Sequence, residues 1–307
     1  MAKDKNKIRQ GWDDTLFDVI NYSCLVVIFL MFTYPLWFIL IASISDPTAV
    51  YLGEVVFWPK GFSTLGYQRV LENPEVWIGY ANTILYTVGG TILNVVLTAM
   101  AGYALSRRDL IGRSRLALIL IITMYFSGGM IPNYLNMRDF HLTNTRLSMM
   151  IVGLVGVSNV LVTRNFFRSS VPWTLQEAAF LDGASDFQVF TQVILPLSKP
   201  ILALITINYA VTHWNDYMNA RIYLRDKSMY PLQMVLRDIL LDTDIESLGT
   251  GTENAETILS QILEQKSADQ IKYALIVVAT VPMLAVYPFL EKHFSRARGQ
   301  MVGGVKG

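Results

Sequence analysis

Six long stretches of this 307-residue chain contain no Asp, Glu, Lys or Arg, and they constrain its fold more than any other feature. They are Ile20–Ser45, Val76–Ser106, Leu116–Met137, Leu147–Thr163, Pro200–Asn215 and Tyr273–Leu290. A helix needs about 20 apolar residues to cross the roughly 30 Å hydrocarbon core of a bilayer, within a range of roughly 17–25. The sequence therefore predicts an all-α membrane protein with about six transmembrane helices.

The composition agrees with this class and excludes others. Apolar residues make up 52% of the chain and charged residues 16%, against roughly 25% charged residues in globular proteins. Such an apolar chain is not disordered, and a net charge of +1 excludes a nucleic-acid binder. The single cysteine, Cys24, excludes a disulfide framework and a cysteine-rich metal site.

Two of the six stretches leave alternatives open. The fifth is short and carries polar residues; we expect it to continue through Asp216 to Ala220, and a broken or re-entrant helix lining a cavity is the alternative. The first follows a basic segment, so a secretory signal is the alternative there, which would leave five spans. Because it lacks a small-residue cleavage site, we interpret it as a retained helix.

Basic residues in the short links predict the orientation, because Lys and Arg resist translocation. Arginines crowd the link between the second and third stretches, and basic residues flank the link between the fourth and fifth: Arg107, Arg108, Arg113, Arg115, Arg164, Arg168 and Lys199. We therefore place both links in the cytoplasm. An even number of spans then predicts a cytoplasmic N-terminal tail (1–18), a membrane domain (19–292) and a cytoplasmic C-terminal tail (293–307).

The longest excursion on the predicted outer side is an extracellular loop, residues 221–272. Its part 242–269 is acidic, and apolar residues recur at helical spacing in Pro231–Leu241 and in Glu256–Gln265. We expect a small folded cap that docks an extracellular partner. A solvated loop without a partner is the alternative.

The cytoplasmic link at residues 168–200 begins with a predicted short helix. Thr174 can cap its first turn, and Glu177, three residues on, can reach back to the Thr174 amide. Gly183 can adopt the left-handed backbone that ends a helix. The sequence therefore predicts a helix that ends in a sharp elbow.

The capping pattern repeats directly after this elbow. Ser185 and Gln188 predict the start of a second short helix, which we expect to run until Pro196. Such a rigid pair of helices, held by membrane spans at both ends, can sit in a cleft of a soluble partner and carry its movement into the bilayer. An ordinary amphipathic link at the membrane surface is the alternative.

This link resembles the EAA motif of membrane permease subunits of bacterial ABC importers. The motif expects Glu-Ala-Ala, three residues, Gly, nine residues, Ile, one residue and Leu-Pro. Glu177-Ala178-Ala179, Gly183 and Leu195-Pro196 match it, with Val193 in place of Ile. Further stretches resemble the carbohydrate-uptake branch of these permeases, among them Gly102–Arg107, Phe126–Pro132, Ile194–Pro200 and His213–Tyr217.

The resemblance implies a type I ABC importer permease fold in a bacterial plasma membrane. It implies no catalytic residue and no cofactor in this chain, because ATP and Mg²⁺ belong to the partner ATPase, and no G-x-x-x-x-G-K-[ST] loop occurs. The implied partners are a second homologous permease subunit forming a heterodimer, two ATPase subunits, an extracellular solute-binding protein, membrane lipid and an oligosaccharide, with no nucleic acid.

Carried onto this sequence, the resemblance assigns ATPase coupling to Glu177, Ala178, Ala179, Asp182 and Gly183. It also implies that Lys306 and Gly307 lie in a tail that reaches toward the ATPase, with a disordered tail as the alternative.

Four residues near the end of the fifth stretch are candidates for the sugar path: His213, Trp214, Asn215 and Asp216. An ionisable group at membrane depth is by default a functional candidate, and an indole face suits a sugar ring. The alternatives are an interfacial anchor or hydrogen bonds between helices. Isolated asparagines such as Asn82 and Asn94 are weaker candidates.

The predicted function is import of sugars or oligosaccharides by alternating access, driven by a partner ATPase. A permease of the same type for an amino acid, a peptide or a metal is the alternative. An intramembrane enzyme would need paired acidic or His residues at matching depth, which only His213 and Asp216 approach. We predict no metal site, because His141 and His293 have no companion at ligand spacing.

Overall fold

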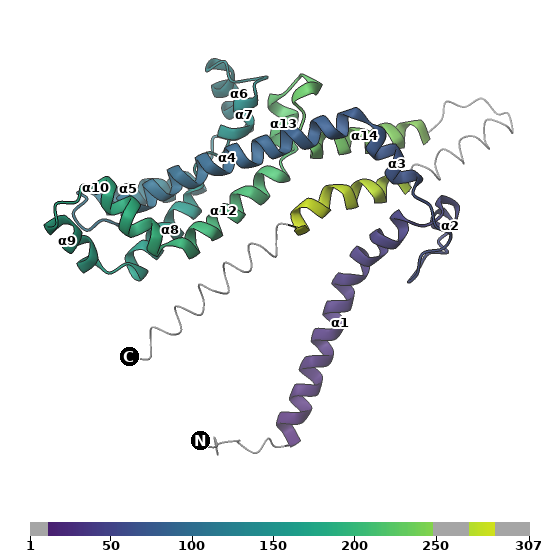
Figure 1. Ribbon diagram of the computed structural model, residues 1–307, viewed down its shortest axis with the longest axis horizontal. Helices are drawn as coiled ribbons and strands as arrows, with labels where there is room; N and C mark the ends of the chain where they lie inside the picture. The colour runs from purple at the N-terminus through teal and green to yellow at the C-terminus, as the bar shows by residue number, and fades with distance from the viewer. Residues whose placement is uncertain (1–11, 248–269, 286–307) are drawn as a thin grey trace. The chain divides into compact units, whose positions relative to one another are not determined.

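The computed structural model describes residues 12–247 and 270–285 (Figure 1). The chain divides into two units, Met1–Val70 with Thr243–Val278 and Leu71–Asp242 with Ala279–Gly307. Within the described residues the regular elements are helices, and the extended backbone is limited to one bridge between Ser45 and Phe62. The predicted all-α class is therefore confirmed.

The first unit begins with the long apolar helix α1 (Trp12–Ser43). Its window Leu16–Ser43 is long and apolar enough to cross a membrane, and large apolar side chains are exposed along most of it. Only the last turn is buried, where Ile41 packs with Ala49 and Val55 in a small core. Such an exposed apolar helix requires lipid or another membrane helix around it.

The remainder of the first unit is a compact base around the end of α1. Asp46 accepts hydrogen bonds from the amides of Thr48 and Ala49 and caps α2 (Pro47–Tyr51). The amide of Gln270 donates to the carbonyls of Ser45 (2.8 Å) and Ser63 (3.1 Å). Gln270 begins the helix Gln270–Ala285, so this side chain joins the start of that helix to the segment after α1.

The second unit is built on α4 (Pro74–Ser106), against which α7 (Arg146–Ile151), α8 (Val157–Ser170) and α12 (Lys199–Trp214) pack. Glycines on α4 allow this close approach. A Cβ at Gly102 would lie 2.8 Å from Cγ2 of Thr163, and one at Gly90 would lie 2.4 Å from Nε2 of His213. Small residues at helix contacts are the usual means of packing helices within a membrane.

The third and fourth apolar stretches are interrupted, unlike the continuous helices that their composition predicts. The third forms α5 (Arg113–Tyr125) and α6 (Met130–Asp139), which are bent by 111°. The fourth forms α7 and α8, separated by residues 152–156. Gly129 (φ 90°) and Gly153 (φ 70°) lie at these breaks, and both adopt backbone that an α-helix cannot contain.

The fifth stretch is one unbroken helix, α12, which ends at Trp214. Our prediction that it continues through Asp216 to Ala220 is wrong, because the chain turns at residues 215–217 and then begins α13 (Met218–Tyr223). Helix α12 is bent by 84° relative to the preceding segment Asp186–Leu197. The bend therefore lies at the start of this span.

Beyond α13 the chain forms η2 (Lys227–Met229) and α14 (Leu232–Ser247). Helix α14 confirms the helix predicted at Pro231–Leu241. The predicted helix at Glu256–Gln265, most of the acidic segment 242–269, the C-terminal tail with Lys306 and Gly307, and residues 1–11 of the N-terminal tail lie outside the described residues.

Within the described part of the chain, α1 and α4 are the helices long and apolar enough to cross a membrane without a break. Two bent pairs of helices also have the length and apolar content of a span: α5 with α6, and Asp186–Leu197 with α12. If each pair is one span, the described residues contain four candidate membrane spans. The helix Gln270–Ala285 is apolar but shorter.

Candidate functional site

We call Trp173–Leu197 the coupling segment; it lies at the Ser106 end of α4 (Figure 1). Its first helix is α9 (Trp173–Leu181). The predicted cap at Thr174 is wrong, because the helix begins one residue earlier and its N-cap, Pro172, provides no side-chain hydrogen bond. Glu177 instead accepts a 2.6 Å hydrogen bond from the indole Nε1 of Trp173.

The elbow at the end of α9 forms as predicted. Gly183 has a φ of 85°, its amide donates to the carbonyl of Phe180, and the amide of Ala184 donates to that of Ala179. These two bonds are the Schellman arrangement, which satisfies the last carbonyls of a helix. A Cβ at Gly183 would meet nothing within 4 Å, so glycine is favoured here by backbone conformation and not by space.

The second half of the coupling segment begins with the predicted capping box. The Ser185 hydroxyl accepts from the amide of Gln188, while the Gln188 side chain accepts from the amide of Ser185. The chain continues through α10 (Asp186–Gln188), a π-helical stretch η1 (Val189–Ile194) and α11 (Leu195–Leu197). The helix thus ends one residue beyond the predicted Pro196. π-Helical turns inside helices are frequent at functional sites.

One face of the coupling segment is buried in the core of the second unit. Val189 and Ile194 are fully buried, Phe190 is 8% exposed, and Ala179 and Phe180 pack against the same cluster. The cluster also includes residues of α4, α8 and α12, namely Ala99, Tyr103, Phe167, Ile201, Ile205 and Tyr209. The coupling segment is therefore anchored to three helices of the unit.

The opposite face is open to solvent and carries large apolar side chains. Leu181 is 88% exposed and Phe187 is 70% exposed, on either side of the elbow. Glu177, Ala178 and Asp182 are exposed as well, whereas Ala179 is half-buried. We call Glu177, Ala178, Leu181, Asp182 and Phe187 the elbow face. Exposed apolar side chains among charged ones are typical of a protein interface.

The four candidates for the sugar path lie in different surroundings. His213 is buried against Gly90 of α4, and Nε2 of His213 has no hydrogen-bond partner among the described residues. Asn215 donates to the carbonyl of Val211. Asp216 accepts from both the amide and the side chain of Asn219, which lies in the first turn of α13. These three residues have local structural partners or contacts.

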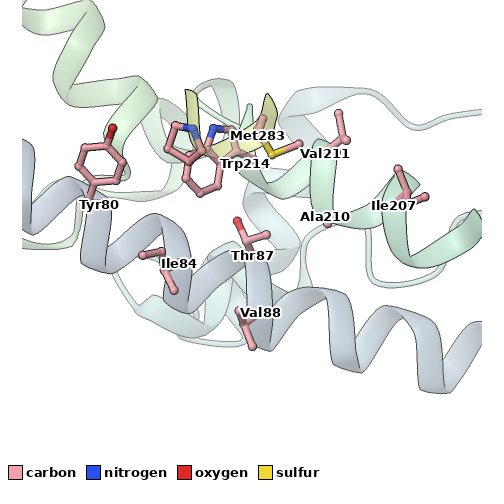
Figure 2. A pocket seen from close by; sticks show the side chains of 10 residues that line it. Tyr80, Ile84, Thr87, Val88, Ile207, Ala210, Val211, Trp214 and Met283 are labelled. Atoms are coloured by element: carbon pink, nitrogen blue, oxygen red, sulfur yellow. The ribbon is translucent and has the colours of Figure 1, made fainter. Parts of the chain in front are cut away.

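Trp214 is the member of this group that lines a cavity of about 430 Å³ (Figure 2). Side chains from α4 and α12 and from residues 282–283 form its walls: Tyr80, Ile84, Thr87, Val88, Ile207, Ala210, Val211, Trp214, Pro282 and Met283. The walls are almost entirely apolar; Thr87 Oγ1 is buried there without a partner among the described residues. This cavity can receive an apolar surface or the face of a ring.

A second hollow, of about 360 Å³, carries two guanidinium groups. Arg221, Arg225 and Tyr134 line it together with apolar residues, and Nη2 of Arg225 lies 3.4 Å from the hydroxyl of Tyr134. Within the described residues, no carboxylate forms a salt bridge with Arg221 or Arg225. Two guanidinium groups without carboxylate partners favour an anionic ligand.

The structure adds residues that the sequence did not assign to the site. Arg107 and Arg108, which the sequence predicts only as markers of the cytoplasmic side, contact the coupling segment. The guanidinium of Arg107 pairs with Asp186, and that of Arg108 lies over the ring of Trp173. The sequence marked this region only through the resemblance of Gly102–Arg107 to other permeases. That resemblance does not indicate which residues Arg107 and Arg108 contact.

Comparison with known proteins agrees with this arrangement. Residues 115–300 match the family described as binding-protein-dependent transport system inner membrane component. The chain is 35% identical to the polygalacturonan/rhamnogalacturonan transport system permease protein YtcP of Bacillus subtilis, over 95% of this chain and 99% of that protein. It is 26% identical to the melibiose/raffinose/stachyose import permease protein MelC of Bacillus subtilis, over 88% and 91% of the two chains.

A solved structure shows the same fold. The crystal structure of a bacterial ABC transporter involved in the import of the acidic polysaccharide alginate matches 94% of this chain and 100% of its own chain, with a TM-score of 0.83 and 34% identity.

The fold and these comparisons define a helical membrane subunit of a transport system, which is a transporter component and not an enzyme. The chain belongs to the family of binding-protein-dependent transport system inner membrane components, with the type I ABC importer permease fold. The predicted fold class and family are therefore confirmed, as is the predicted function as a transport permease.

Proposed function

We propose that this chain is the permease subunit of an ATP-driven importer of sugars or oligosaccharides, and that its elbow face docks onto an ATPase. The observation that carries the docking is the exposure of Leu181 and Phe187 beside Glu177, in a segment whose other face is buried. Membership of the family and the saccharides named for its relatives support the transport function.

The assembly follows from this role. We propose a heterodimer with a second homologous permease, two ATPase subunits and an extracellular solute-binding protein. This chain then holds no cofactor, and ATP and Mg²⁺ are bound by the ATPase subunits. The coupling segment and both termini face the cytoplasm, and residues 242–269 dock the binding protein. Closure of the ATPase pair would displace the elbow face and switch the permeases between inward-facing and outward-facing states.

We further propose that the substrate is an acidic oligosaccharide. Arg221 on α13 and Arg225, two residues beyond this helix, provide cationic groups. Helix α13 lies away from the coupling segment (Figure 1), where the binding protein would release its sugar. The names of two similar proteins refer to polygalacturonan and to the acidic polysaccharide alginate. The carboxylates of such sugars would pair with guanidinium groups.

Of the four residues predicted for the sugar path, Trp214 is kept here as a sugar contact, because it lines the cavity of about 430 Å³. The indole of Trp214 forms a wall of this cavity, and its Nε1 is held by the carbonyl of Ala279 (3.2 Å). We propose that Trp214 contacts the sugar, and that His213, Asn215 and Asp216 keep α12 and α13 in place around it. The alternative of a non-sugar solute finds no support among the saccharide permeases that resemble this chain.

A charge placed on the elbow face tests the docking. In the complete transporter, Leu181→Arg should abolish co-purification of the ATPase and sugar uptake, because it places a cation in an apolar contact. Ile111→Arg is the matched control: Ile111 is 95% exposed in the loop after α4 but lies outside the coupling segment. Full ATPase binding and uptake by Leu181→Arg would refute the docking surface.

The transport function itself is tested with the unaltered chain. Membranes that contain it should yield a complex with an ATPase and a second permease, and proteoliposomes of this complex should import the oligosaccharide that the binding protein retains. A binding protein that retains only amino acids, peptides or metals would refute the proposed substrate class.

A further inference from the structure

Arg107, the residue that follows α4, contacts four parts of the second unit. Its guanidinium pairs with Asp109 in the next loop and with Asp186 on α10. The same group lies 3.2 Å from the hydroxyl of Tyr103 on α4 and 5.1 Å from the ring centroid of Phe180 on α9. Only 17% of the Arg107 side chain is exposed. A planar guanidinium can pair with carboxylates along its edge while its face rests on a ring.

Different nitrogens of the Arg107 guanidinium bind the different partners. Its Nε and Nη2 donate to the two carboxylate oxygens of Asp109, whereas its Nη1 donates to Asp186 and to the hydroxyl of Tyr103. The hydrogen bonds from Arg107 lower the pKa of Asp109 below its ordinary value. Asp109 therefore stays ionised and orients the guanidinium, and Asp186 makes the connection to the coupling segment.

Arg108 contacts the other end of α9. Its Cζ lies 5.8 Å from the ring centroid of Trp173, the first residue of the helix. Trp173 in turn holds Glu177 through its indole nitrogen. Two consecutive arginines thus contact α9 near its first and last turns, and one of them also contacts α10.

An aromatic contact lies beside these polar ones. Tyr103 of α4 stacks on Phe190 of the π-helical stretch, with ring centroids 5.1 Å apart and an angle of 28° between the planes. The coupling segment is joined covalently toward α8 and α12. Its connection to α4, the longest helix of the unit, depends on side chains alone.

We propose that Arg107 and Arg108 form a clamp that makes the coupling segment and α4 move together when the ATPase displaces the elbow face. This role rests on the proposed docking of the elbow face to an ATPase. Without the clamp, a displacement of α9 would still reach α12 through the chain, but it would reach α4 only through apolar packing, with no polar contact to hold α9 and α10 to the end of α4. ATP would then be hydrolysed without a full conformational change of the permease.

Neutralising Asp186 tests the clamp. In proteoliposomes of the complete transporter, Asp186→Asn should raise the ATP hydrolysed per sugar imported by about threefold, while the ATPase still co-purifies. Asp139→Asn is the matched control, because Asp139 pairs with Arg138 on α6 and is equally exposed (67%, against 69% for Asp186). The control should leave the ratio unchanged.

Arg107 variants separate the clamp from a simple positive charge. Arg107→Ala should raise the ratio at least as much as Asp186→Asn. Arg107→Lys should recover it only in part, because an ammonium group cannot pair along an edge and stack at once. If Arg107→Ala does not assemble, the ATP hydrolysed per sugar imported by Asp186→Asn is the deciding measurement, because the Asp186 side chain is exposed and its substitution should not disturb folding.

An unchanged ratio in Asp186→Asn, or full recovery in Arg107→Lys, would overturn the clamp. Failure of the proposed function would be distinguishable, since the unaltered complex would then lack an ATPase or would import no sugar.

Discussion

The indole Nε1 of Trp173 donates a 2.6 Å hydrogen bond to Oε1 of Glu177, one turn further along α9. This bond fixes the carboxylate of the Glu-Ala-Ala sequence on the surface of the helix. It also replaces the predicted capping box, in which Glu177 would reach back to the amide of Thr174. Glu177 is thereby oriented on the elbow face before any partner binds.

Removing the indole donor should weaken coupling. Trp173→Phe keeps an aromatic ring beneath Arg108 but loses the hydrogen bond to Glu177, a contribution of about 1 kcal/mol. We expect sugar uptake to fall about fivefold with normal amounts of protein in the membrane. Trp77→Phe is the control, because the Trp77 indole also donates one exposed bond, 2.8 Å long, to the carbonyl of Leu71. Equal uptake by the two variants would contradict an orienting role for Trp173.

The left-handed backbone of Gly183 gives a second prediction. Gly183→Ala meets no steric obstacle but places a Cβ on a residue with φ of 85°, which costs roughly 1–2 kcal/mol. We expect lower uptake from Gly183→Ala, near-normal uptake from Gly183→Asn, because asparagine tolerates this conformation, and none from Gly183→Pro.

A glycine elsewhere controls for backbone strain as such. Gly153 has φ of 70° with nothing within 4 Å of its added Cβ, and it lies between α7 and α8. Gly153→Ala should lower thermal stability by a similar amount while coupling is kept. Uptake by Gly183→Ala equal to that of the natural chain would show that the elbow tolerates another geometry.

The contact of α4 with α12 predicts a destabilising substitution. A Cβ at Gly90 would lie 2.4 Å from Nε2 of His213, and overpacking of this kind costs about 1–3 kcal/mol. Gly90→Ala should lower the melting temperature of the detergent-solubilised protein, and adding His213→Ala should restore it. At the adjacent Gly89 the added Cβ would meet only the flexible side chain of Met150, so Gly89→Ala should be mild. No rescue by His213→Ala would argue against this contact.

The hollow at Arg225 predicts a selectivity for acidic sugars. Arg225→Ala should raise the KM for uptake of trigalacturonate about tenfold, because one charge-assisted pair is lost. The KM for the fully methyl-esterified trigalacturonate, which carries no charge, should be unaffected by Arg225→Ala. Arg138→Ala is the control, since Arg138 already pairs with Asp139. An equal effect on both sugars would instead indicate that the hollow binds carboxylates of the binding protein.

Local sequence patterns predicted the parts of the site that depend on local backbone geometry. Gly183 ends α9, and Ser185 with Gln188 caps α10, because turn and cap conformations are governed by a few neighbouring residues. The breaks at Gly129 and Gly153 were not predicted. Apolar content alone cannot distinguish a straight helix from a bent one when the residues on both sides of the break are apolar.

The sequence by itself determined the membrane class, the helical elements and the elbow of the coupling segment, since charge distribution and capping depend on residues close in the chain. Only the tertiary structure decided that Arg107 reaches Asp186, 79 positions away, and that His213 packs on Gly90. Such contacts depend on how α4, α12 and the coupling segment approach each other, and that approach is set by the packing of many side chains at once.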